Sequence, residues 1–305
     1  MSFRLRLLNF GLRWLARPRL ARADDPVRAR RNFDLVARLF RVPPYVLHLV
    51  EAGSVPLHWI SVRRRYVDWV ILYLHGGAYA TGSPLTHLAL MARIAKLTGL
   101  QVVAPEYRLA PEHPAPAAFD DVLAAHAVLI AKGCAVDRII LAGDSAGGGL
   151  ALAVLAELCA CGLRPAGLFA FSPWTDLALG GDSLVRNAAS EVFLPAARLL
   201  FAVDLVRGAV SASDPRLSPV HAVFNRAPPV VLQVGTAEIL LDDSRRMADV
   251  LRQAGGDVTL SEWPDCPHVW QMLDGYVPEA RAALVEVAGF VERLVKSSPR
   301  PPDGS

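Results

Sequence analysis

The chain contains little cysteine. Its four cysteines, spread over 305 residues, form no Cys-x-x-Cys pair, and such spacing suits neither a zinc site nor a disulfide framework. The eight histidines are scattered, without the close pairs typical of metal ligands. We therefore expect free thiols and no metal site, and, in the absence of an export signal, a cytoplasmic location.

Long apolar runs are also missing. A membrane-spanning helix needs about 20 consecutive apolar residues, and the nearest candidate, residues 146–163, starts with glycines and carries Glu157. In the N-terminal residues 1–23, arginines interrupt every apolar run, which excludes the core of a signal peptide. We interpret this segment as an amphipathic helix packed on the body, with attachment to a membrane surface as the alternative. No stable membrane insertion is expected.

Neither sign of charge dominates. The formal net charge is +3, and no basic stripe with interleaved aromatic residues occurs, so we expect no nucleic-acid partner. Hydrophobic residues make up 53% of the chain and charged residues 20%, the balance of a packed globular protein rather than a disordered one. An α/β protein of this length can form a single domain.

What the sequence does contain is a regular alternation of strand-like and helix-like segments, which begins near residue 45. Short apolar runs bounded by turn residues predict strands over residues 45–50, 55–62, 69–74, 101–104, 138–142, 166–171, 229–234 and 258–262. Helical spacing predicts helices over residues 84–97, 117–131, 146–161, 243–253 and 278–295. This alternation indicates an α/β fold with a mainly parallel central sheet and helices on both faces. The first two strands should form a hairpin at an antiparallel edge.

Two helix-like segments do not fit the alternation: residues 1–44 and residues 185–215. We interpret them as N-terminal cap helices and a second cap segment, packed over the edge of the sheet where ligands bind in such folds. The α/β core would then comprise residues 45–184 and 216–296. The polar, proline-rich residues 297–305 are expected to form a frayed tail.

The sharpest chemical motif is Gly-Asp-Ser-Ala-Gly at residues 143–147. It matches G-x-S-x-G, the strained strand-to-helix turn that exposes a nucleophilic serine. A predicted strand ends just before the motif and a predicted helix starts inside it. Glycine is required because side chains two positions from the serine would collide with neighbouring backbone. We predict that Ser145 is a nucleophile and that the helix behind it favours a developing anion.

A second motif, His-Gly-Gly-Ala at residues 75–78, follows directly after a predicted strand. An oxyanion hole needs backbone N–H groups that approach a substrate closely, which a glycine loop permits. Beside an ordinary tight turn, we therefore weigh an anion-binding loop. In this interpretation the N–H groups of Gly77, Ala78 and Ala146 bind the oxyanion, and Gly76 shapes the loop.

The nucleophile needs a base, and His268 has the expected place in the chain. It follows the last predicted strand and precedes the closing helix, which matches the order serine, acid, histidine of α/β hydrolases. The other histidines precede the serine or lie far from strand ends, apart from His221. We predict that His268 is the general base.

The acid should follow the strand predicted at residues 229–234, where several carboxylates occur. Glu238 comes soonest after the strand end, so a loop can carry it towards the base. Asp243 stands where a helix should begin, which favours a helix N-cap. We predict Glu238 as the acid, with Asp242 as its rival and Asp265 as a more distant one.

Together these motifs resemble the hormone-sensitive-lipase-like branch of the α/β hydrolases, the bacterial group IV esterases, over residues 45–295. The resemblance rests on residues 75–79 (His-Gly-Gly-Ala-Tyr), 107–114 (Tyr-Arg-Leu-Ala-Pro-Glu-His-Pro), 143–148 (Gly-Asp-Ser-Ala-Gly-Gly), 172–174 (Ser-Pro-Trp) and 238–243 (Glu-Ile-Leu-Leu-Asp-Asp), followed by His268. It implies an α/β-hydrolase fold with a helical cap in two segments.

The resemblance carries further expectations. It implies that the loop 107–114 braces the active site without reacting, and that copies can pair into a homodimer through the last strand and closing helix. Two positions depart from the family pattern. Ala78 replaces the usual third glycine, where only an N–H is needed, and Glu238 replaces the usual aspartate, with one more methylene of reach.

The expected activity is that of a carboxylesterase with a Ser-His-Glu triad, an acyl-enzyme intermediate, a small-molecule ester substrate and no cofactor. Cap residues near Phe193, Leu194, Phe201 and Leu205 should confine an apolar pocket, which favours acyl chains of about two to eight carbons. The same triad also serves amidases, formamidases and acyltransferases. A non-catalytic, receptor-like binding protein is a more distant alternative.

Overall fold

The central sheet sets the arrangement of the molecule. The computed structural model describes residues 1–22, 24–62 and 65–298, and within them the sheet has eight strands in the order β1-β2-β4-β3-β5-β6-β7-β8. Their bounds are β1 (Leu47–Glu51), β2 (Leu57–Ser61), β3 (Val70–Leu74), β4 (Gln101–Pro105), β5 (Ile139–Asp144), β6 (Gly167–Phe171), β7 (Val230–Gly235) and β8 (Val258–Trp263). β2 is antiparallel to β1 and β4, and the remaining pairs are parallel. The predicted parallel sheet with an antiparallel edge is confirmed.

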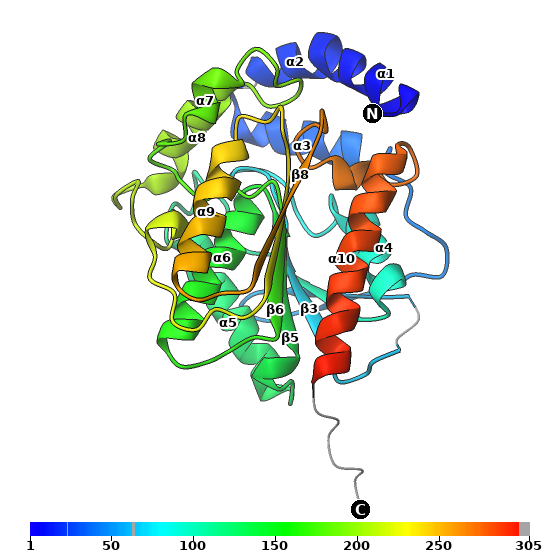
Figure 1. Ribbon diagram of the computed structural model, residues 1–305, viewed down its shortest axis with the longest axis vertical. Coiled ribbons are helices and arrows are strands. Elements are labelled where there is room, and N and C mark those ends of the chain that lie inside the picture. Colours follow the sequence, from blue (N-terminus) through cyan, green and yellow to red (C-terminus); the bar gives the residue numbers. More distant parts are fainter. Residues whose placement is uncertain (23, 63–64, 299–305) are drawn as a thin grey trace, which may run out of the picture.

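Helices cover both faces of this sheet (Figure 1). On one face lie α4 (Leu88–Thr98) and α10 (Pro278–Ser297), and on the other α5 (Ala117–Ala131), α6 (Ala146–Ala160) and α9 (Leu241–Gln253). Successive side chains of a strand point to opposite faces. In β3, Leu72 joins the core cluster of α5, α6 and α9, whereas its neighbour Ile71 joins that of α4 and α10. The central strands are apolar throughout because both faces are buried.

A second group of helices gathers beyond one end of the sheet, at the top of Figure 1. The group consists of α1 (Phe3–Gly11), the π-helical turn η1 (Leu12–Ala16), α2 (Arg17–Ala21), α3 (Pro26–Ala37), α7 (Ser183–Arg186) and α8 (Ala196–Arg207). Local sequence starts two of them. The hydroxyl of Ser2 accepts a hydrogen bond from the N–H of Leu5 at the start of α1. Asp25 caps α3 in the same way, with Pro26 in its first turn.

The N-terminal helices contact loops that follow strands. Asn9 donates to the carbonyl of Asp265, after β8 (2.8 Å), and Arg30 donates to the carbonyls of Ala80 and Ala110, after β3 and β4 (2.8 and 2.7 Å). α1 and α3 therefore lie over the carboxyl ends of parallel strands. The division of the chain into core and cap segments at residues 44, 184 and 215 stays a prediction.

The helix predicted from residue 84 begins later, at Leu88. Ser83 and Thr86 exchange hydrogen bonds between side chain and backbone, and this local pairing holds the chain in a turn instead of a first helical turn. At the other end, α10 extends through Ser297. Most of the predicted frayed tail, residues 299–305, lies outside the described residues.

Three 3₁₀ segments complete the secondary structure of the described ranges: η2 (Val136–Arg138), η3 (Pro219–His221) and η4 (Trp270–Leu273). In this part of the chain, no helix combines the length and the apolar character that crossing a bilayer requires.

Two leucines on α1 offer a matched test of how this helix is held. Leu5 is fully buried in a cluster with Cys266, Trp270 and Val277, whereas Leu7 is 63% exposed. Leu5→Ala should weaken the docking of α1 by about 2–5 kcal/mol because it leaves a cavity. Leu7→Ala should change it by less than about 0.5 kcal/mol. Hydrogen exchange of the α1 amides measures both, and equal protection in the two variants would contradict this packing.

Candidate active site

Ser145 lies at a strained turn between β5 and α6. Its backbone adopts φ 52° and ψ −125°, a region that residues other than glycine rarely occupy. The turn is held by a hydrogen bond from the N–H of Ser145 to the carbonyl of Phe171 (2.8 Å). A Cβ atom at Gly147 would collide with the carbonyl oxygens of Leu74 and His75. Glycine at this position lets β3 and the start of α6 approach each other beneath the serine.

The structure brings Ser145, His268 and Glu238 together from three different strand ends. Nε2 of His268 lies 2.9 Å from Oγ of Ser145, and Nδ1 lies 2.8 Å from Oε2 of Glu238. The two side chains are buried, with 6% of His268 and 1% of Glu238 exposed. Because a carboxylate only accepts, Nδ1 carries the proton and Nε2 is free to accept the serine hydroxyl proton.

Two further donors fix the carboxylate of Glu238. Its Oε1 accepts from the hydroxyl of Ser172 (2.7 Å) and from the N–H of Gly235 (2.6 Å). The same hydroxyl accepts from the N–H of Val269, next to His268 (3.2 Å). Ser172 was not singled out as a positioning residue by the sequence. The sequence feature that could have indicated this role is the Ser-Pro-Trp motif, which begins at Ser172 directly after β6.

The rival acids have other partners. Asp242 accepts from the N–H of Ser183 (2.8 Å) and pairs with Arg186 (2.9 Å). Asp265 is exposed in the loop after β8, and its N–H donates to the hydroxyl of Thr236 (3.3 Å). Neither carboxylate is hydrogen-bonded to His268 in the described structure.

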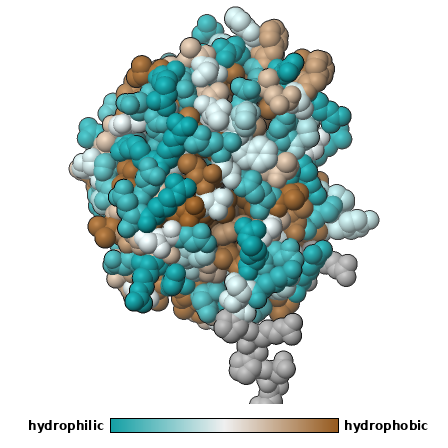
Figure 2. Space-filling view, in the orientation of Figure 1, coloured by the Kyte–Doolittle hydropathy of each residue, from teal (hydrophilic) through white to brown (hydrophobic). Residues whose placement is uncertain are grey.

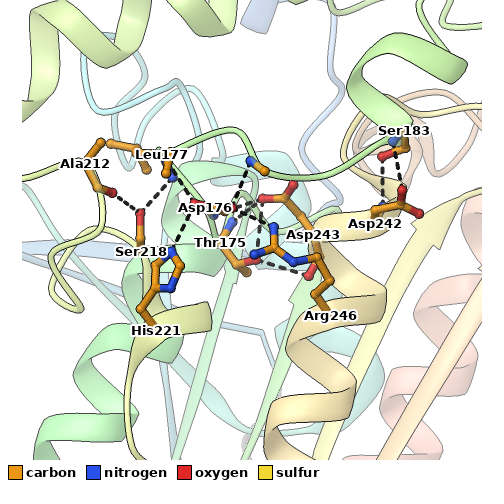
Figure 3. A network of polar contacts seen from close by, with 12 residues as sticks. Thr175, Asp176, Leu177, Ser183, Ala212, Ser218, His221, Asp242, Asp243 and Arg246 are labelled. Carbon is orange, nitrogen blue, oxygen red and sulfur yellow. Dashed lines mark hydrogen bonds and ion pairs between the residues drawn. The ribbon is translucent and has the colours of Figure 1, made fainter.

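Asp243 does not cap a helix, so that prediction is wrong. α9 begins at Leu241 without a side-chain cap, and the carboxylate of Asp243 instead accepts from the backbone N–H groups of Thr175 and Asp176 (2.8 and 3.0 Å). Burial raises the pKa of Asp243 to about 7, against the effect of these donors. The contact attaches α9 to the loop after β6, as Figure 3 shows.

The remaining histidine candidate, His221, belongs to the same network. Its Nε2 lies 3.4 Å from Oδ1 of Asp176, whose other oxygen pairs with Arg246 (2.6 Å). In Figure 3 this group surrounds Asp176 between the loop and α9. These contacts connect the loop after β6 with α9 and η3, so His221 has a structural role.

A second buried carboxyl group lies beside the triad and was missed by the sequence analysis. Glu191 is 1% exposed and accepts from the N–H groups of Phe193 and Leu194 (2.8 and 3.2 Å) and of Ile239 (3.3 Å). Burial and the nearby charge of Glu238 raise the pKa of Glu191. No motif marks this residue, because its contacts with Ile239 and Glu238 join distant parts of the chain.

The charge environment favours protonation of His268. Burial by itself lowers the pKa of this imidazole, but the hydrogen bond and charge of Glu238 outweigh it, with smaller effects from Glu191 and Asp144. The net pKa of His268 is therefore above its ordinary value of 6.5. These negative charges stabilise the imidazolium that forms when His268 takes a proton.

The loop at residues 75–78 lies next to the serine turn. Gly77 has φ +123°, and a Cβ there would collide with the carbonyl of Thr81. The N–H of Gly76 donates to Oδ1 of Asp144 (3.1 Å), so this group positions the loop. In the described part of the chain, the N–H groups of Gly77, Ala78 and Ala146 have no protein acceptor. These three groups remain available to an anion.

Asp144, the variable residue of the serine motif, connects the two motifs. Its buried carboxylate accepts from the hydroxyl of Tyr73 (2.8 Å) and from Gly76, and lies 3.3 Å from Nε2 of His87. Burial raises the pKa of Asp144, but His87 and Tyr73 lower it, with a net decrease. This carboxylate is therefore held in its charged form at the base of the site.

The loop at residues 107–114 braces the glycine loop, as the resemblance implied. Tyr107 stacks on His75 (4.2 Å between ring centroids) and donates to its carbonyl oxygen (2.6 Å). The N–H of Ala110 donates to the carbonyl of Tyr79 (2.9 Å). Burial and the neighbouring His87 lower the pKa of His75 to about 3, so this ring stays neutral at the pH of ordinary assays.

The four cap residues that were predicted to confine an apolar pocket lie in different surroundings. Leu194 and Leu205 are half-buried against the core. Phe193 is half-buried beside Glu191. Phe201 is 37% exposed, lies under the guanidinium of Arg198 (4.4 Å) and lines a surface groove. Phe201 therefore contributes to the outer face of α8.

The likeness to known proteins extends over most of the chain. A family model described as "alpha/beta hydrolase fold" matches residues 71–272. An acetyl-hydrolase of Streptomyces hygroscopicus is 40% identical over 249 residues, which cover 81% of this chain and 82% of that protein. An esterase of Acinetobacter venetianus is 37% identical over 272 residues, with 88% and 89% covered.

One solved structure matches the fold of this chain over almost its whole length. The crystal structure of an esterase from the bacterial hormone-sensitive lipase (HSL) family matches with a TM-score of 0.91 and 33% identity, over 97% of this chain and 99% of that one. Sequence and structure therefore give the same answer: the chain belongs to the α/β-hydrolase family, in its hormone-sensitive-lipase-like group, and is a serine ester hydrolase.

Proposed function

We propose that the chain hydrolyses carboxylic esters of short to medium acyl length through an acyl-enzyme on Ser145. The observation that carries the proposal is the hydrogen-bonded row from Ser145 through His268 to Glu238, with separations of 2.9 and 2.8 Å. Such separations suit proton transfer from a nucleophile to its base.

In the acylation step, Oγ of Ser145 attacks the ester carbonyl carbon, and its proton passes to Nε2 of His268. Glu238 accepts from Nδ1–H, holds this tautomer and stabilises the imidazolium. When the tetrahedral intermediate collapses, the imidazolium returns the proton to the departing alkoxide, which leaves as an alcohol. The acyl group remains bonded to Ser145.

Deacylation repeats these steps with water as the nucleophile. His268 takes a proton from the water, whose oxygen attacks the acyl carbon, and the proton then returns to Oγ of Ser145 as the carboxylic acid leaves. In both steps the oxyanion is bound by the N–H groups of Gly77, Ala78 and Ala146. A single such donor is worth about 3–4 kcal/mol of transition-state stabilisation.

The proposed chain length rests on two supports. One relative of comparable length is named an acetyl-hydrolase, and the acetyl group has two carbons. In addition, Glu191, whose electrostatic neighbours are Glu238 and His268, accepts hydrogen bonds from the backbone N–H groups of Phe193 and Leu194, so this apolar part of the cap belongs to the segment beside the triad. A confined apolar space favours acyl chains of about two to eight carbons.

An acyl-chain profile tests the function. Purified chain assayed on p-nitrophenyl esters should act fastest on acyl groups of about two to eight carbons.

A serine variant tests the nucleophile. Ser145→Ala should lower kcat by about 10⁵–10⁶-fold because the nucleophile is lost, whereas the exposed Ser213→Ala should match the wild type. Faster turnover of a palmitate than of a butyrate ester would contradict the length, and an active Ser145→Ala would contradict the nucleophile. Amide substrates and acyl acceptors in the same panel separate hydrolysis of esters from amidase and transferase activity.

A pair of isosteric variants tests the acid. Glu238→Gln should lower kcat about 10³–10⁴-fold because an amide does not hold the proton on Nδ1 of His268. Asp242→Asn should cost less than about tenfold, since its carboxylate pairs with Arg186 rather than with the base. Circular dichroism checks that both variants are folded. A larger loss in Asp242→Asn would transfer the role to Asp242.

The pH dependence tests the base. Below its raised pKa, His268 is protonated on Nε2 and cannot accept the serine proton, so kcat/KM should fall as the pH decreases through an apparent pKa above 6.5. Glu238→Gln removes the contributions that raise this pKa, so its residual activity should show an inflection at lower pH. A profile that is flat from about pH 5 to 8 would exclude an imidazole base.

A further inference from the structure

The outward side of the first helix carries a continuous apolar stripe. Phe3, Leu7, Phe10 and Trp14 are 79%, 63%, 64% and 64% exposed. Their spacing of four, three and four residues places them on one side of the continuous helix formed by α1 and η1. We call these four residues the outer stripe. In Figure 2 brown and tan residues gather at the upper right, where Figure 1 places α1.

Packing of the fold does not account for the outer stripe. The opposite side of α1 already carries the fully buried Leu5 and the half-buried Leu8 against the body. Polar contacts add to this attachment, because Ser2 binds Glu279 (2.9 Å) and Asn9 binds the carbonyl of Asp265 (2.8 Å). A docked helix whose free side is also apolar presents a surface suited to a partner.

The charges around the stripe indicate the kind of partner. Residues 1–22 contain six arginines, at positions 4, 6, 13, 17, 19 and 22, and no aspartate or glutamate. Arg4, Arg6, Arg19 and Arg22 are exposed. Helices that combine tryptophan, phenylalanine and leucine with arginine on their polar sides are typical of those that lie in a membrane interface. Anionic headgroups complement such a cluster, and each arginine near the surface adds to the attraction.

A second copy of the chain fits this surface less well. A two-fold contact through the outer stripe would place the same arginines of both copies close together, and like charges facing each other oppose association. An anionic lipid surface can take up the apolar side chains of the outer stripe and bind the arginines at the same time.

We propose that α1 and η1 bind the surface of an anionic lipid membrane, with the outer stripe at the boundary of headgroups and acyl chains. The same helix covers the loops beside the active site: Asn9 contacts Asp265, three residues before His268, and Arg13 donates to the carbonyls of Ala189 and Ser190 (2.9 and 3.0 Å), beside Glu191. Membrane binding therefore places the cover of the active site against the lipid. The helix lies on the membrane and does not span it.

Vesicle flotation with the full chain tests this. Wild type should bind vesicles of phosphatidylcholine with phosphatidylglycerol, bind pure phosphatidylcholine less, and be released as salt is raised. Phe10→Gln/Trp14→Gln should reduce binding by about tenfold or more because it removes two apolar anchors. Glutamine is a good helix former, so α1 should persist. The control Val223→Gln/Val285→Gln, at two residues 77% and 51% exposed elsewhere, should bind like wild type.

A second variant tests the charges separately. Arg4→Gln/Arg6→Gln should weaken binding to the anionic vesicles by about tenfold or more and leave binding to pure phosphatidylcholine unchanged. Hydrolysis of soluble p-nitrophenyl acetate should be equal in all variants, which shows that they are folded. Wild-type binding to neither vesicle, or equal binding by wild type and both variants, would overturn the proposal. So would a change from dimer to monomer in Phe10→Gln/Trp14→Gln without vesicle binding, since that identifies a protein contact.

Discussion

The buried carboxylate of Asp144 is the interaction on which the site depends. It lies at the end of β5, one residue before Ser145, and accepts hydrogen bonds from Tyr73 on β3 and from the N–H of Gly76. A charge at this depth persists only with several polar partners. Its partners are the strand and loop that carry the proposed oxyanion donors, so the serine turn and the glycine loop are held as one unit.

Two further carboxylates act on His268 from the other side of the site. Glu238 is fixed by Ser172 and Gly235 and contacts His268 directly, while Glu191 adds negative charge from the segment between α7 and α8. The imidazole is buried, which disfavours its charged form, and the carboxylates reverse that preference. The segment between α7 and α8 therefore contributes to the electrostatics of the site through Glu191.

Much of the core followed from local patterns. The strands and the serine turn were predicted because short apolar runs and glycine motifs are local signals. His268 and Glu238 were predicted from their places in the order of the chain. Asp243 was assigned to a helix cap, since a carboxylate before a helical pattern usually has that role. Its actual partners are the N–H groups of Thr175 and Asp176, which are 68 and 67 residues away in the chain, and helical spacing holds no information about them. The start of α4 was misplaced because Ser83 and Thr86 close a local turn that competes with the helix.

The sequence by itself determined the fold class, the order of nucleophile, acid and base, and the glycines that backbone contacts require, because each depends on chain order or on local sterics. Only the tertiary structure decided which carboxylate meets His268, that Glu191 lies beside it, and which side of α1 is packed. Leu5 and Leu7 are the same residue two positions apart, yet one is buried and the other exposed. Their difference comes from the surface against which the helix docks, and that surface is assembled from distant segments of the chain.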